Sequence, residues 1–416
     1  MVLQELIFVL LIGMFIAIEL IGKAAYIYLA LFLLMAISVF AYSFAINGQK
    51  VIINKNNLIW LLFPLSITIG FSLKNFHWVR PCIIFFLICI ILIIKINIKE
   101  TITLEKAIVD VALIISVSIF LEWLFPSFFA KNIYPLYPAS QSWILNNQVN
   151  SGLYYSGIMS NVACAALMLS VGAIISLVNN KKINFCIIFT ALLLTGKRAG
   201  LLSFVVLFFV YFVFLKEKNK DKNIRKNKYT IVILVAIFIT AMIAIYMLIE
   251  QKQFISRYFS FLGIFDYKNG NISLDNYLDK ISAGRWTTYK QSFELFLKHP
   301  IKGIGWGNFT FMNYNPYLGE AVLNVHNIYL KLLCETGVIG FFSFVIPAFI
   351  TIRKTWYKIC SGFNKKTYVI AFLVQIQFLI LGLFETEFEN VMFYAVYFAA
   401  IFIASNLKDP DQHEVK

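Results

Sequence analysis

The chain has 416 residues with a net charge of +15, and 60% of its residues are hydrophobic, which gives a mean hydropathy of +0.78. So much apolar material excludes an ordinary soluble globular protein, and apolar runs long enough to cross a hydrocarbon core of about 30 Å recur along the chain. The basic residues lie mainly in short loops between these runs, as expected for an inner-membrane protein, so the charge does not indicate a nucleic-acid partner.

The apolar runs predict an all-α, polytopic helical membrane protein with about twelve transmembrane helices. Their approximate positions are 3–21, 24–46, 58–73, 78–97, 107–125, 157–178, 184–196, 199–215, 229–249, 328–352, 367–385 and 389–405. The first run lacks a basic stretch before it and a small-residue cleavage site after it, so we expect a retained helix. The six cysteines show no C-x-x-C spacing and mostly lie inside the runs, which indicates small buried side chains and no metal site.

Lysine and arginine residues set the expected orientation of the spans. The strongest signal is the segment KEKNKDKNIRKNK, residues 216–228, which we expect on the cytoplasmic side. The basic loops at residues 353–366 and 179–182 fall on the same side if both termini are cytoplasmic. This arrangement places two long loops, residues 126–156 and 250–325, on the outer face.

The two outer loops differ in what they offer a ligand. The first is rich in Tyr, Asn, Ser and Trp, and its aromatic rings could provide stacking surfaces for sugars. The second is the only loop large enough to form a small domain, and it contains a predicted helix over residues 283–299 that Pro300 ends. Four aromatic residues recur in this helix at a spacing of three to four and predict one apolar face. They are Trp286, Tyr289, Phe293 and Phe296.

Three cations of the outer face are candidates for binding a phosphate. Lys197 and Arg198 interrupt an apolar stretch at the outer boundary of the membrane. Gly196 and Gly200 flank this pair and permit a close approach of the backbone. Arg285 opens the predicted loop helix, and its planar guanidinium suits bidentate contacts to phosphate. The alternatives are an interfacial pair that extends to the lipid headgroups and a solvated arginine on an outer loop.

Alternating glycines mark the segment HPIKGIGWGNF, residues 299–309, which follows the predicted loop helix. A dinucleotide-binding fingerprint needs a strand before the glycines and a helix after them, and neither is evident here. The pattern instead predicts a tight turn whose backbone closely approaches another element.

His326 and Asn327 begin a long apolar segment after the second outer loop. Among side chains, unperturbed imidazole titrates nearest to pH 7, so His326 is a candidate general base. The alternative is a polar residue in the cap region of a helix. Together with Arg198 and Arg285 on the outer face, such a base suits a reaction on an anionic lipid-linked substrate. No D-x-D-like acidic pair occurs in the outer loops, so we expect no metal and no cofactor.

The order of three motifs resembles that of the O-antigen ligase/polymerase superfamily of bacterial envelope proteins. The motifs are TGKRAGLL, GRWTTYKQSFELFLKHPIKGIGWGNF and HNIYLKLLCETGVIGFFSF, with a long outer loop between the first and the last. The resemblance covers roughly residues 185–350, and the N-terminal third resembles the family only in hydropathy. It implies metal-independent, inverting glycosyl transfer of the GT-C type on the outer face, from a glycan carried on undecaprenyl diphosphate.

The resemblance also implies roles for individual residues. Arg198 and Arg285 would bind the diphosphate, and Lys197 would add a second cation. His326 would activate the acceptor hydroxyl, and Asn327 next to it would contact the substrate. The family often has Ser-Arg in the first motif where this chain has Lys197-Arg198, so we expect different local hydrogen bonding there.

The resemblance divides the chain into three segments. These are N-terminal transmembrane helices (1–183), a core like that of the O-antigen ligases and polymerases (184–352, with the loop 250–325), and C-terminal helices with a cytoplasmic tail (353–416). The expected location is the bacterial cytoplasmic membrane, with the active site on the outer face. The expected partners are an undecaprenyl-diphosphate-linked oligosaccharide and membrane lipid. A chain-length regulator and a flippase are further candidates.

Three functions remain open at this point. A polymerase joins a lipid-linked glycan to the hydroxyl of another lipid-linked repeat unit, whereas a ligase transfers the glycan to a lipid A core. Heavy use of Ile, Lys, Asn and Phe is typical of the AT-rich coding found in envelope-glycan gene clusters, which favours the polymerase. A flippase would need charges inside the spans, for which Glu19, Asp110 and Glu122 are the candidates.

Overall fold

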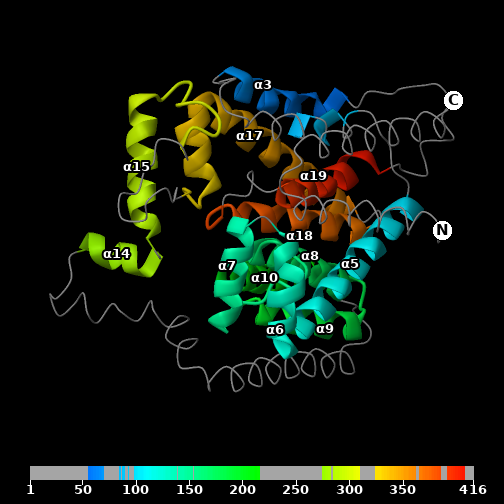
Figure 1. Ribbon diagram of the computed structural model, residues 1–416. Coiled ribbons are helices and arrows are strands. Elements are labelled where there is room, and N and C mark those ends of the chain that lie inside the picture. The colour runs from blue at the N-terminus through cyan, green and yellow to red at the C-terminus, as the bar shows by residue number, and fades with distance from the viewer. Residues whose placement is uncertain are drawn as a thin grey trace. The chain divides into compact units, whose positions relative to one another are not determined.

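The computed structural model describes residues 55–69, 84–85, 87–89, 92, 98–137, 139–152, 154–215, 274–282, 284–309, 324–361, 365–385 and 391–407. These residues form helices joined by turns, with no strand among them (Figure 1), which confirms the all-α prediction. They fall into two compact units. The first unit contains the described residues from 102 to 215, and the second contains those from 55 to 101 and from 274 to 407.

The first unit is organised around the helix α8. Its elements are α5 (Ile98–Leu124), α6 (Pro126–Phe128), η2 (Phe129–Ile133), η3 (Tyr134–Leu136), α7 (Ala139–Asn150), α8 (Val162–Val178), α9 (Lys182–Leu194), α10 (Arg198–Val210) and η4 (Tyr211–Leu215). All 17 residues of α8 are buried, and α8 packs against α9 and α10. A Cβ placed on Gly172 of α8 would lie 2.4 Å from that of Ala112 in α5. Such small residues let helix backbones approach closely.

The predicted outer loop 126–156 folds back onto α5 through polar contacts. The buried carboxylate of Glu122 accepts hydrogen bonds from the Tyr134 hydroxyl and from the Gly157 backbone N–H. The hydroxyl of Ser118 accepts a hydrogen bond from the Ile158 N–H at 3.1 Å. Glu122, a candidate charge for the flippase hypothesis, therefore makes local packing contacts. Another of these candidates, Glu19, lies outside the described residues.

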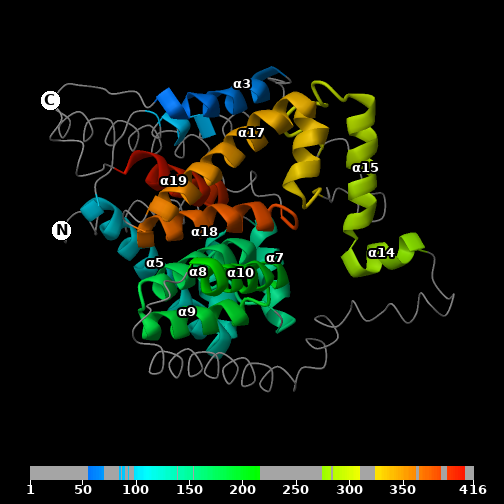
Figure 2. The ribbon, with the colours of Figure 1, turned by 180° about the vertical axis from the view of Figure 1, so that it is seen from behind.

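The second unit is organised around the long helix α17. Its elements are η1 (Lys55–Leu61), α3 (Leu62–Ile69), α14 (Leu274–Ser282), α15 (Arg285–Lys298), α17 (Ile328–Ser361), α18 (Lys365–Leu381) and α19 (Val391–Asn406), and Figure 2 gives the reverse view. Helix α17 contacts α3, α15, α18 and α19. Aromatic rings fill the crossing: Phe378 stacks on Tyr397 with centroids 4.1 Å apart, and Trp60 meets Phe344 edge-on at 6.2 Å. The Trp60 indole donates a hydrogen bond to the Thr351 hydroxyl at 3.1 Å.

Several described helices are apolar enough for a membrane. Three are also long enough to cross one, and they are Thr101–Leu124, Arg198–Leu215 and Ile328–Ser361. Shorter apolar helices at Asn57–Thr68, Val162–Val178, Lys182–Leu194 and Phe393–Asn406 overlap further predicted spans. The predicted spans 3–21, 24–46 and 229–249 lie outside the described residues, as does most of 78–97. The total of twelve therefore remains a prediction.

Helix α17 is longer than the predicted span 328–352, because it continues to Ser361. On this extension Thr355 and Ile359 are buried. The Lys358 ammonium donates a hydrogen bond to the Ala404 carbonyl at 3.0 Å. The predicted basic loop after residue 352 therefore begins as packed helix, and hydropathy alone placed its boundary too early.

Helix α15 confirms the predicted loop helix 283–299, whose aromatic face was expected to lie on the membrane surface or to pack on the spans. The buried residues of α15 are Thr288 and Ser292, whereas Phe293 is 48% exposed. The hydroxyls of Thr288 and Ser292 donate to backbone carbonyls of α15 itself, at 2.8 and 2.9 Å. Because these small side chains are satisfied internally, they permit α15 to pack closely on α17. Hydropathy counts Thr288 and Ser292 as polar and takes no account of their hydrogen bonds within α15, so it did not predict their burial.

Candidate active site

A break in α17 receives the glycine-rich turn that follows α15. Gly337 interrupts the helix with φ 64 and ψ −166. The freed carbonyls of Cys334 and Glu335 accept hydrogen bonds from the N–H groups of Ile304 and Gly305, each at 2.9 Å. A Cβ on Gly337 would lie 2.3 Å from the Ile301 carbonyl oxygen. The backbone of the glycine-rich turn therefore packs directly against the backbone of α17 at Gly337, which confirms the predicted tight turn.

Glu335 fixes the same contact through its side chain. Its carboxylate is fully buried and accepts a hydrogen bond from the Phe309 N–H at 3.2 Å. It also lies 3.9 Å from the ammonium of Lys331, one turn earlier in α17. Lys331 in turn donates to the Asn324 side chain at 3.4 Å. Glu335 therefore ties the turn to α17, and through Lys331 to the segment that carries His326.

Replacing Gly337 with Ala is expected to destabilise the second unit. The backbone conformation at Gly337 is one that only glycine readily adopts, which costs other residues roughly 1–3 kcal/mol, and the added methyl group would also overlap the Ile301 carbonyl. Thermal unfolding of the purified protein in detergent would measure the loss. The exposed neighbour Ile339, changed to Ala, is the control. A Gly337→Ala protein as stable as this control would contradict the proposed backbone contact.

Arg285 is held at the start of α15 by the preceding helix. Gly284 is the N-cap residue of α15, with φ 80, and its N–H donates to the Asp279 carbonyl at 2.8 Å. The Asp279 carboxylate accepts a hydrogen bond from the Thr287 N–H at 2.9 Å, which satisfies a backbone donor of the first turn. The guanidinium of Arg285 donates from Nη1 to the carbonyl of Phe384 at 2.8 Å.

His326 and Asn327 lie at the start of α17 and have different roles there. Asn327 caps the helix, since its side-chain oxygen accepts from the N–H groups of Tyr329 and Leu330, each at 3.0 Å. Its Nδ2 donates to the Leu383 carbonyl at 3.3 Å. His326 precedes the cap in a left-handed conformation with φ 49, and strained backbone of this kind is frequent at functional sites. The helix cap is therefore Asn327 and not His326.

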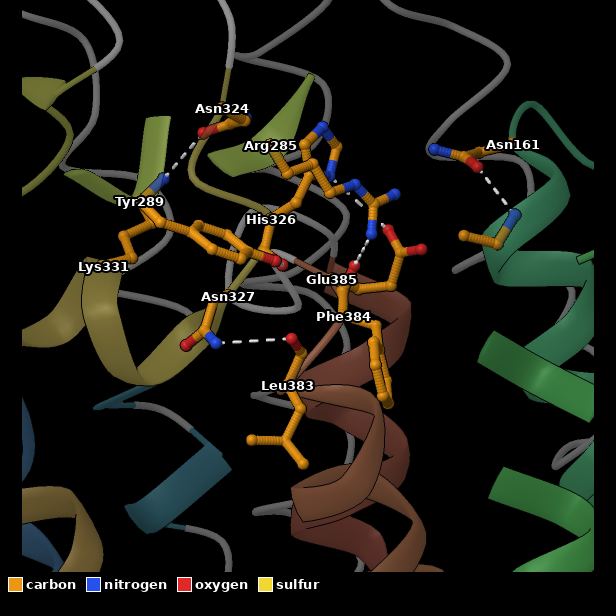
Figure 3. Close-up of polar contacts among 11 residues, drawn as sticks. Asn161, Arg285, Tyr289, Asn324, His326, Asn327, Lys331, Leu383, Phe384 and Glu385 are labelled. Carbon is orange, nitrogen blue, oxygen red and sulfur yellow. Dashed lines mark hydrogen bonds and ion pairs between the residues drawn. The ribbon is translucent and has the colours of Figure 1, made fainter. Parts of the chain in front are cut away.

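The segment Gly382–Glu385, which follows α18, holds all three of these residues (Figure 3). The Gly382 carbonyl accepts a hydrogen bond from the Ile328 N–H at 2.7 Å. The next two carbonyls bind Asn327 and Arg285, as described above. The Glu385 carboxylate then lies 3.8 Å from Nδ1 of His326. Four consecutive residues thus each make one contact with the start of α15 or of α17.

Glu385 is not among the site residues predicted from the sequence, because it lies at the end of the predicted apolar span 367–385. The available signal was the acidic sequence FETE at the C-terminal end of that run. Glu385 and Arg285 also act on the neighbouring Tyr289, whose hydroxyl donates to the His326 carbonyl at 3.4 Å. Burial raises the pKa of the Tyr289 phenol; the Arg285 charge opposes this rise and the Glu385 charge adds to it. The site therefore combines a cation, a carboxylate and an imidazole.

A comparison with known families identifies the superfamily. Residues 183–345 match the family model described as O-Antigen ligase. The match agrees with the resemblance of this segment to the O-antigen ligase/polymerase superfamily. The proteins of this family are membrane-integral, glycosyltransferase-like enzymes that act on lipid-linked oligosaccharide. The matched segment contains Arg198, Arg285 and His326 but ends before Glu385. No curated protein matches the chain.

The first motif of the resemblance, TGKRAGLL, lies in the first compact unit. Gly196, with φ 62, forms the turn between α9 and α10, and the Thr195 hydroxyl accepts a hydrogen bond from the Lys197 N–H at 3.3 Å. Gly200 packs against α8, where an added Cβ would lie 2.9 Å from that of Ala166. The two glycines therefore serve a turn and a helix contact. Lys197 and Arg198 are half-buried at the start of α10, and their part in the site remains a prediction.

Metal binding was not expected from the sequence. Within the described ranges, no group of three or more His, Cys, Asp or Glu residues is placed to hold a metal ion. His299 is the exposed C-cap residue of α15, and His77 and His413 lie outside the described residues. Among the described histidines, His326 is the one that lies in the candidate active site.

Proposed function

We propose that this superfamily member is a polysaccharide polymerase. It would transfer a glycan from undecaprenyl diphosphate to a hydroxyl of another lipid-linked repeat unit, on the outer face of the cytoplasmic membrane. The observation that supports this proposal is the meeting of Arg285 and His326 at the segment Gly382–Glu385, from three different elements. A phosphate-binding cation and a base beside each other are what such a transfer requires.

The transfer would exchange one bond for another at the anomeric carbon. The Phe384 carbonyl accepts one N–H of Arg285, whereas a guanidinium carries five. Arg285 would bind the diphosphate with its remaining donors, which form strong charge-assisted bonds to phosphate. The bond from the anomeric carbon to the diphosphate oxygen breaks, and the acceptor oxygen bonds to that carbon from the opposite face. The acceptor proton passes to the imidazole of His326. Lys197 and Arg198 would add positive charge at the leaving diphosphate.

The proposal includes the wider setting predicted from the sequence. It comprises about twelve spans, a GT-C-like architecture, metal-independent transfer and cytoplasmic termini. The core segment 184–352 would carry the chemistry between the helical segments 1–183 and 353–416. A flippase would supply the lipid-linked substrate on the outer face, and a chain-length regulator would bind nearby.

A ligase is the second candidate, because the matching family model is itself described as O-Antigen ligase. It would use the same cation and base to transfer the finished glycan to a lipid A core. The difference lies in the acceptor, so an experiment on the products separates the two functions.

Deletion of the gene is expected to leave single repeat units in place of long chains, since a polymerase makes the bond between units. Gel analysis of lipid-linked and surface glycans would measure chain length, and complementation with the wild-type gene is the control. Long polymer that accumulates on the lipid carrier and is absent from the core would instead identify a ligase. Normal chains, in a strain without a second polymerase, would refute both candidates.

A further inference from the structure

We propose that Glu385 is a positioning residue for His326, and that the segment Gly382–Glu385 is the frame on which the site is built. The proposal rests on the proposed function, because it assigns His326 the role of base. Glu385 lies 40 residues beyond the matched segment 183–345, by subtraction of 345 from 385, and outside the three motifs of the resemblance.

The burial of Nδ1 indicates how the His326 ring is oriented. Nδ1 is fully buried, lacks a hydrogen-bond partner among the described residues and lies 3.8 Å from the Glu385 carboxylate. The side chain as a whole is nevertheless 35% exposed, whereas that of Glu385 is 9% exposed. Because Nδ1 is buried, the exposed surface of the side chain belongs to its other atoms, and we infer that Nε2 is the nitrogen that substrate can reach. An acceptor would approach Nε2 while the carboxylate stays behind the ring.

A carboxylate behind an imidazole has a known physical effect. A hydrogen bond from Nδ1–H to a carboxylate selects the tautomer whose Nε2 carries the free lone pair, and it stabilises the imidazolium that forms when a proton arrives. The present separation of 3.8 Å is longer than a hydrogen bond, and such contacts often tighten only when substrate is bound. Glu385 would thus act on the reaction through His326 without touching substrate.

The backbone hydrogen bonds of the frame explain why the Glu385 carboxylate is held beside the His326 ring. The carbonyls of Gly382, Leu383 and Phe384 accept hydrogen bonds from Ile328, Asn327 and Arg285. These three bonds fix the backbone of the frame against α17 and α15. The next residue along the frame is Glu385, so its side chain starts from a fixed point beside His326. A merely solvated glutamate would have no such constraint.

The experiment measures transfer kinetics of Glu385→Gln, which keeps the size of the side chain and removes its charge. We expect kcat to fall about 10–10²-fold, the scale seen when the carboxylate that orients a metal-ligating histidine is removed, while KM for the lipid-linked donor stays unchanged. Glu385→Asp should restore part of the rate. Asp275→Asn, which changes an exposed carboxylate of α14 paired with Lys290, is the matched control and should leave transfer unchanged.

A second arm combines Glu385→Gln with His326→Ala. Residues that act as a unit are not additive, so the added Glu385→Gln should cause no further loss once His326 is gone. A further loss of the same size in that background would overturn the positioning role, as would a wild-type rate in Glu385→Gln alone. No transfer by the wild-type protein would instead refute the proposed function, which keeps the two failures distinct.

Discussion

His326→Ala is expected to lower the rate of glycan transfer by about 10²–10⁴-fold, the usual contribution of a positioned general base. The folded structure should persist, because the main contacts at this position belong to its neighbours: Asn327 caps α17, and Tyr289 donates to the backbone carbonyl of His326. The measurement is kcat on a lipid-linked substrate, with membrane insertion checked in parallel.

The left-handed backbone at His326 calls for a second variant. His and Asn adopt positive φ more readily than Ala does, so His326→Asn removes the base with less strain at φ 49. If both variants lose transfer to a similar degree, the loss comes from the missing imidazole and not from the backbone. Near-wild-type polymer from either variant would mean that His326 is not the base.

Arg285→Ala is expected to reduce kcat/KM by roughly 10²–10³-fold, the scale seen when one donor that stabilises transition-state charge is removed. Arg285→Lys should recover only part of the activity, because an ammonium keeps the charge but loses the planar fork that binds phosphate in a bidentate manner. Steady-state kinetics with varied lipid-linked donor would measure both variants.

A cation at the far end of the same helix provides the control for Arg285. Lys298→Ala removes an exposed charge in the last turn of α15, which should leave kcat/KM unchanged. Equal losses in Arg285→Ala and Lys298→Ala would indicate a general effect of charge. Full activity of Arg285→Ala would remove Arg285 from the site.

The features that sequence predicted best are those set by local chemistry. Pro300 ends the loop helix close to its predicted boundary, and the helix is observed over Arg285–Lys298. The alternating glycines after it predicted a close backbone approach, and Gly303 indeed meets the backbone of Glu335, where an added Cβ would lie 2.3 Å from the carbonyl carbon. Glycine and proline restrict or free the backbone directly, so their effects can be read without knowledge of the partner.

The features that sequence did not reveal depend on contacts between distant residues. Glu385 lies 59 positions from His326, by subtraction of 326 from 385, and the acidic sequence FETE around it does not show which distant residue it contacts. Thr288 and Ser292 form the buried face of α15, although hydropathy ranks the aromatic residues of that helix higher. Packing at close range favours small side chains, and this preference depends on the neighbouring helix.

The break at Gly337 links the structure of the site to its chemistry. It divides α17 into a short N-terminal part, which begins at Ile328 beside His326, and a longer apolar part that ends at Ser361. The turn that follows α15 docks at this break, so α15 and the N-terminal part of α17 are held together near Arg285 and His326. The long apolar helix would anchor this arrangement in the membrane.

The most direct test of the catalytic role assigned to Arg285 and His326 is glycan transfer by the purified protein in phospholipid vesicles. The assay would contain a lipid-linked repeat unit and no energy source, and gel separation would measure the length of the products. Wild-type protein is expected to form longer chains, and His326→Asn protein, folded and inserted to the same extent, is expected to form them about 10²–10⁴-fold more slowly. Chains of equal length from both proteins would contradict the assignment of His326 as the base.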